Sequence, residues 1–157
     1  MTINFEEILN NFETTYQEVS DKKQPFTALI DYIDKLYSAI DSLHNKNDFE
    51  KYVDKLYQAI EKLNFLIKEL AVNAIISESE LSEPQKETLR LNFDYSYSDS
   101  CKQALSLVLK VCQEHLDTNR KEKYYQSYKQ FHSKQIEIDK RLTELQFGSN
   151  DDEPNNK

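Results

Sequence analysis

The feature that most constrains the fold is the spacing of apolar residues between positions 49 and 74. Spacings of four and three residues alternate along this segment, through Phe49, Val53, Leu56, Ile60, Leu63, Ile67, Leu70 and Ala74. That alternation places all eight side chains on one face of an α-helix, in the pattern of a heptad seam. The sequence therefore predicts a long amphipathic helix over about residues 48–76.

A second seam precedes this one and nearly repeats part of its sequence. Phe26, Leu29, Ile33, Leu36, Ile40 and Leu43 have the same spacing, and residues 31–43 (DYIDKLYSAIDSL) match residues 51–63 (KYVDKLYQAIEKL) at eight positions. The offset of twenty residues is one short of three heptads, so the two copies cannot share one unbroken seam. With the polar break at 44–48, this predicts an αα-hairpin over 25–76 made of two similar helices.

Helices are also predicted on either side of the hairpin. Residues 4–20 carry a seam behind Asn4 and Glu7, which form a plausible capping box, and Ser82 with Gln85 forms another. Pro84 would lie in the first turn of the helix that follows Ser82. The chain has only 1 Gly and 3 Pro, which fits helices and disfavours a turn-rich β architecture.

The pattern after this fourth start is ambiguous. Residues 91–97 alternate apolar and polar side chains with period 2, as a half-buried strand does, but a lone strand has no partner in this chain. We therefore favour a helix or an extended connector there. Ser100 with Gln103 could cap the next helix. The seam that resumes at 124–145 belongs either to a new helix capped by Asn119 and Glu122 or to one long helix with a phase shift.

These patterns predict an all-α fold, an antiparallel bundle of four to five long helices with coiled-coil-like heptad seams. A single domain is expected over residues 1–147. The segment 148–157 has no apolar residue to bury, so it is expected to be a disordered acidic tail.

The charge is acidic and unevenly distributed. The formal net charge is −8, which disfavours nucleic-acid and anionic-membrane partners, and residues 102–145 are the one mildly basic stretch. The best apolar run, 63–76, contains Lys68, Glu69 and Asn73 and is too short to span a bilayer. The chain begins without a signal-like segment, and two cysteines eleven residues apart suggest free thiols. We expect a cytoplasmic protein.

Motifs for catalysis and cofactor binding are weak. The only glycine is Gly148, so the common phosphate-binding loops are excluded. Cys112 with His115, and Asp41 with His44, have one-turn spacing, but neither pair recurs to complete a metal site. We therefore expect a protein that is not an enzyme, with no cofactor and no metal.

Tyrosines are the most informative candidate surface. Tyr32, Tyr37, Tyr52 and Tyr57 flank the two seams, and Tyr125 has no seam position. Tyr buries a large ring while keeping a wet hydroxyl, which suits both the rim of a bundle and a protein interface. These tyrosines could pack within the bundle, or they could contact a partner or a second copy. The five residues are therefore the candidate partner interface.

Residues 120–135 interleave basic and aromatic side chains, as single-stranded nucleic-acid binders do. Arg120, Lys121, Lys123 and Lys129 would contact phosphates, although the same residues can be the solvated flanks of a seam. The predicted function is a non-enzymatic protein–protein interaction module, a small cytoplasmic adaptor, chaperone-like or inhibitor protein. It would present an acidic, Tyr-bearing helical face to a protein partner, with homodimer formation as an option. The alternative is a regulator of a nucleic-acid-handling machine, acting through charge mimicry or through residues 120–135.

Overall fold

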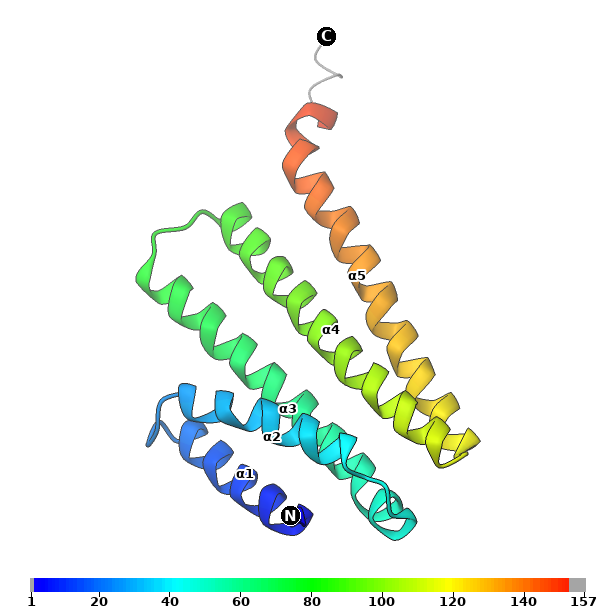
Figure 1. Ribbon diagram of the computed structural model, residues 1–157. Helices are drawn as coiled ribbons and strands as arrows, with labels where there is room; N and C mark the ends of the chain where they lie inside the picture. Colours follow the sequence, from blue (N-terminus) through cyan, green and yellow to red (C-terminus); the bar gives the residue numbers. More distant parts are fainter. Residues whose placement is uncertain (1, 153–157) are drawn as a thin grey trace.

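The computed structural model describes residues 2–152, and the side chains of residues 2–147. This part of the chain contains five α-helices and no strand: α1 (Phe5–Ser20), α2 (Thr27–Asp41), α3 (Lys46–Glu78), α4 (Glu83–Glu114) and α5 (Thr118–Asp152). Consecutive helices are antiparallel neighbours (Figure 1). The prediction of an all-α antiparallel helical bundle is confirmed.

Helix starts follow the side chains that can cap them. The Asn4 side chain accepts from the backbone N–H of Glu7 at 3.0 Å, and Ser82 and Gln85 form a reciprocal capping box. α3 begins at Lys46, two residues earlier than predicted, because the Asn45 side chain caps it by accepting from the N–H groups of Asn47 and Asp48. Each cap satisfies N–H groups that have no partner inside the helix.

The helices are arranged around α3 and α4. α1 packs on α2 and α3, α2 also packs on α3 and α4, and α5 packs along α4. Figure 1 shows α5 on one side of α4 and the pair α1 and α2 on the other side of α3. The first five positions of the α3 seam, from Phe49 to Leu63, are at most 1% exposed and form the centre of the core.

The ambiguous segment 91–97 lies inside one continuous helix, α4, so the expected cap at Ser100 is wrong. The apolar alternation arises because this segment of α4 contacts both α3 and α5. Tyr97 packs against Phe65 of α3, while the backbone carbonyl of Tyr95 accepts from the Gln135 side chain of α5. A helix that contacts other helices on two faces needs apolar residues on both faces. Its sequence then no longer shows the single apolar stripe of an amphipathic helix.

The sequence left open whether one helix or two would extend to residue 145. The structure has two, α4 and α5. Leu116 has φ 55°, in the left-handed region, and this residue turns the chain between α4 and α5. The carboxylate of Asp117 then accepts from the N–H of Arg120 at 3.0 Å, so Asp117 and not Asn119 caps α5. α5 continues to Asp152, into the segment 148–157 predicted to be a tail; residues 153–157 lie outside the described residues.

Candidate functional site

A hollow of about 400 Å³ lies where the turn between α1 and α2 passes over the distal half of α3. We call it the turn groove; it is lined by Val19, Lys22, Lys23, Gln24, Pro25, Phe26, Leu70 and Ala74. Most of its lining atoms are apolar. Phe26 at its edge is 38% exposed, and Ile30, one turn further along α2, is 44% exposed.

The groove exists because the helices differ in length. α1 ends at Ser20 and α2 begins at Thr27, whereas α3 continues to Glu78. The seam positions Leu70 and Ala74 therefore lie beyond the ends of the two helices that cover the earlier part of the α3 seam. Leu70 is half-buried and Ala74 is exposed, although both have the heptad spacing of core residues.

The turn itself is held in one conformation. Lys22 has φ 63°, in the left-handed region, and the N–H of Lys23 donates to the carbonyl of Glu18 at 2.8 Å. This arrangement closes the C-terminal end of α1 and directs the chain over α3. It also places Lys22 and Lys23 among the residues that line the hollow.

The electrostatic character of the groove differs from that of the acidic half around it. None of its lining residues is acidic. Within the described part of the chain, neither Lys22 nor Lys23 forms an ion pair, whereas Lys62 and Lys68 on α3 each bind a carboxylate. The turn groove therefore combines an apolar floor with two unpaired positive charges.

The candidate tyrosines separate into buried and accessible rings. Tyr52 is 7% exposed and stacks on Phe5, and Tyr57 is 5% exposed and packs edge-on against Tyr124. Burial, followed by the neighbouring Glu61, raises the pKa of Tyr57 above its ordinary value. For Tyr52 and Tyr57 the structure shows packing within the bundle, which leaves too little ring surface for a partner.

The other three candidate tyrosines keep exposed surface. Tyr32 is half-buried, with its hydroxyl 3.3 Å from that of Thr15. Tyr37 donates to the carbonyl of Ser100 at 3.4 Å, and burial raises its pKa. Only Tyr125 has a largely free ring, 47% exposed, with Lys129 above it. The structure does not bring these three rings together into one surface.

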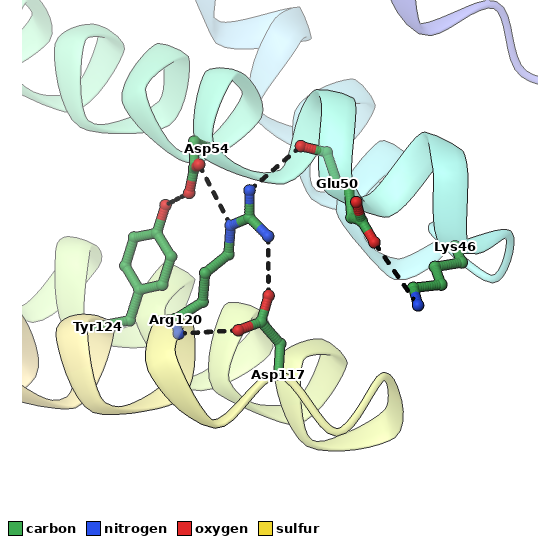
Figure 2. Close-up of polar contacts among 6 residues, drawn as sticks. All are labelled: Lys46, Glu50, Asp54, Asp117, Arg120 and Tyr124. Atoms are coloured by element: carbon green, nitrogen blue, oxygen red, sulfur yellow. Dashed lines mark hydrogen bonds and ion pairs between the residues drawn. The ribbon is translucent and has the colours of Figure 1, made fainter.

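The basic segment that starts α5 is partly used to attach this helix to α3. Figure 2 shows the Arg120 guanidinium between Asp54 and Asp117, at 3.3 and 2.7 Å, with a further bond to the carbonyl of Glu50. The Tyr124 hydroxyl donates to the other carboxylate oxygen of Asp54. Burial, and then this bond, raises the pKa of Tyr124 above its ordinary value. Arg120 is therefore not free to bind a phosphate.

The three candidate lysines of this segment, Lys121, Lys123 and Lys129, are all exposed. Lys121 donates to the side chain of Gln113. Lys123 lies over the ring of Tyr124 and Lys129 over that of Tyr125, at 5.1 Å in both cases. Their contribution to nucleic-acid binding stays a prediction.

The thiols and imidazoles have structural environments. Cys101 and Cys112 are free and fully buried, and burial raises the pKa of each thiol to about 11. Such thiols are poor nucleophiles at neutral pH. His115 donates to the carbonyl of Leu43 at 2.6 Å and stacks on Phe49. Among the described residues, no three His, Cys, Asp or Glu side chains gather as a metal site would require.

In the described part of the chain, no helix has both the length and the apolar character needed to cross a membrane.

The turn groove was not identified from the sequence because Phe26, Leu70 and Ala74 were all assigned to seams. One signal pointed to it. The predicted helix 48–76 is much longer than its hairpin partner 25–44, so part of its seam had to extend past that partner. The sequence does not show the path of the α1–α2 turn. It therefore does not show which segment borders the seam positions that the shorter helix leaves uncovered.

Comparisons of the chain with models of protein families, with curated proteins and with solved structures found no match.

Proposed function

We propose that this protein is a non-enzymatic interaction module of the cytoplasm that binds a segment of a protein partner in the turn groove. The observation that carries the proposal is the apolar hollow of about 400 Å³ above Leu70 and Ala74. A hollow of this kind can accept a large apolar side chain, and such anchors supply much of the energy of protein interfaces.

The rim of the groove supports a partner of a particular chemistry. Among the described residues, Lys22 and Lys23 are the only charged ones that line it. Carboxylates next to the anchoring side chain would pair with these two ammonium groups. Such exposed pairs contribute modestly to affinity but direct the orientation of the bound segment. The preferred ligand is therefore an acidic segment with one bulky apolar residue.

The remaining surface supports selectivity. The chain carries a formal charge of −8, so it repels most acidic proteins at a distance. A partner is held only if its apolar residue reaches the groove and its acidic residues reach the two lysines. An adaptor or an inhibitor would both work in this way.

Affinity capture with a matched pair of variants tests the proposal. Ala74→Glu places a carboxylate at the floor of the groove, and Asn73→Glu adds the same charge at the adjacent exposed position, which does not line the groove. Tagged wild-type protein and both variants are incubated with an extract of the native host, and bound proteins are quantified by mass spectrometry.

We expect a protein that binds wild type and Asn73→Glu equally and binds Ala74→Glu at least about tenfold less, because an apolar contact must then desolvate a carboxylate. Circular dichroism checks that both variants keep the helicity of the wild type. Equal capture by all three proteins would show that the turn groove is not the binding site.

A further inference from the structure

The last residues of the chain have the chemistry that complements the turn groove. Phe147 lies near the end of α5 and is 46% exposed. It is followed by Gly148 and, within six residues, by Asp151, Asp152 and Glu153. This segment, residues 147–153, is acidic and contains one bulky apolar residue, whereas the groove offers an apolar floor and two unpaired lysines.

The described end of α5 does not approach the groove of its own chain. α5 packs along α4, while the turn groove belongs to α1, α2 and α3. Figure 1 shows the end of α5 far from the α1–α2 turn, with α3 and α4 between them. A contact between segment 147–153 and the turn groove therefore joins two copies of the chain.

We propose that segment 147–153 of one copy docks in the turn groove of a second copy. Phe147 packs on Leu70 and Ala74, and the carboxylates that follow it pair with Lys22 and Lys23. The inference rests on the proposed function, because it names an occupant for the same groove. Reciprocal exchange of the two segments gives a closed dimer, and one-way docking gives a longer chain of copies.

Occupation by a second copy would regulate access to the groove. A partner that carries a similar acidic and apolar segment competes with segment 147–153 for the same floor and the same lysines. At high protein concentration self-association covers the groove, and dilution frees it. Removing the acidic charges of the segment should therefore strengthen partner binding.

Charge reversal in the full-length chain tests this contact. One variant is Lys22→Glu/Lys23→Glu, which reverses the rim of the groove, and the other is Asp151→Lys/Asp152→Lys, which reverses the segment. The control, Lys51→Glu/Lys55→Glu, makes the same charge change at two exposed lysines outside the groove. Light scattering follows the average mass of each protein from about 1 µM to about 1 mM, the range of weak association.

The wild type and the control are expected to rise from 18.6 kDa toward twice that mass. Each reversed variant alone should associate at least about tenfold more weakly, because like charges then face each other. An equimolar mixture of the two reversed variants should associate again, since the acidic rim of one can bind the basic segment of the other.

Three results would overturn the inference: a wild type that stays at 18.6 kDa throughout, association that neither reversal weakens, or a mixture that does not recover. None of them bears on the proposed function, which is decided by capture with Ala74→Glu and Asn73→Glu. If the wild type captures no protein from the extract while self-association stays charge-dependent, the second copy is the occupant and a separate partner is rejected.

Discussion

Three side chains decide how α5 is attached to the rest of the molecule. Asp54 on α3 receives both the Tyr124 hydroxyl and the Arg120 guanidinium, and Arg120 also binds Asp117 (Figure 2). Tyr124 was predicted as a seam residue and Arg120 as a basic flank, so the sequence predicted burial of one and exposure of the other but not their common partner. The partners are 66 and 70 residues away in the chain, and no local pattern encodes such pairs.

Removing the Tyr124 hydroxyl should destabilise the protein measurably. Tyr124→Phe keeps the buried ring but takes away the donor to Asp54. We expect a loss of about 1.5–3 kcal/mol in the free energy of unfolding, typical of a hydrogen bond to a charged group. Urea unfolding followed by circular dichroism measures it. Tyr125→Phe, at the exposed neighbouring position, is the control and should change stability by less than about 0.5 kcal/mol.

The cap of α5 should make stability depend on pH in the acid range. The backbone N–H of Arg120 donates to Asp117, and together with the guanidinium of Arg120 it lowers the pKa of this carboxyl in the folded state. A lowered folded pKa gives stability that is fully present above the unfolded value of about 3.9 and is lost as the pH falls through the folded pKa.

Asp117→Asn keeps a capping side chain but removes this titration. Its free energy of unfolding should therefore fall less than that of the wild type between about pH 4 and pH 2. Asp139→Asn, at an exposed position without an ion pair among the described residues, is the control. Parallel acid profiles for wild type and Asp117→Asn would contradict this account of the cap.

At the scale of the helices, length and capping explain most of the fold. The seams of α2 and α3, the start of α1 and the Ser82 capping box were all predictable, because heptad spacing and caps are local properties of the chain. The pattern of α4 was not predictable, since α4 packs against three other helices. The turn groove was also not predictable, because it depends on where α1 and α2 end relative to Leu70 and Ala74.

The connection between α4 and α5 contains a residue that is unfavourable for its conformation. Leu116 adopts φ 55° and is 78% exposed, so its side chain gains little from burial. Leu116→Gly should raise the free energy of unfolding by up to about 1 kcal/mol, because glycine adopts the left-handed region without the clash of a Cβ atom.

A glycine inside the helix should act in the opposite direction. Gln113→Gly, three residues earlier and exposed in the last turn of α4, should lower stability by about 0.5–1 kcal/mol. Thermal unfolding of both variants measures the difference. If both glycines destabilise equally, the left-handed turn at Leu116 is wrong.

At the scale of the whole molecule, the distribution of charge separates the turn groove from its surroundings. The protein carries −8 overall, yet the groove presents two unpaired lysines and no acidic lining residue. Binding there should weaken as salt screens these lysines, but it should not vanish, because the apolar floor contributes independently of salt. Capture of the partner at 0.15 and 0.5 M NaCl should therefore show a moderate decrease.

Hydrogen exchange of the full-length protein, with and without the captured partner, tests the central claim most directly. Mass spectrometry of peptides from residues 19–30 and 67–76 reports on the turn groove. We predict that the partner slows exchange in both of these segments, while residues 120–135 exchange as in the free protein. Protection confined to residues 120–135, or to the exposed faces of α4 and α5, would contradict the assignment of the turn groove as the binding site.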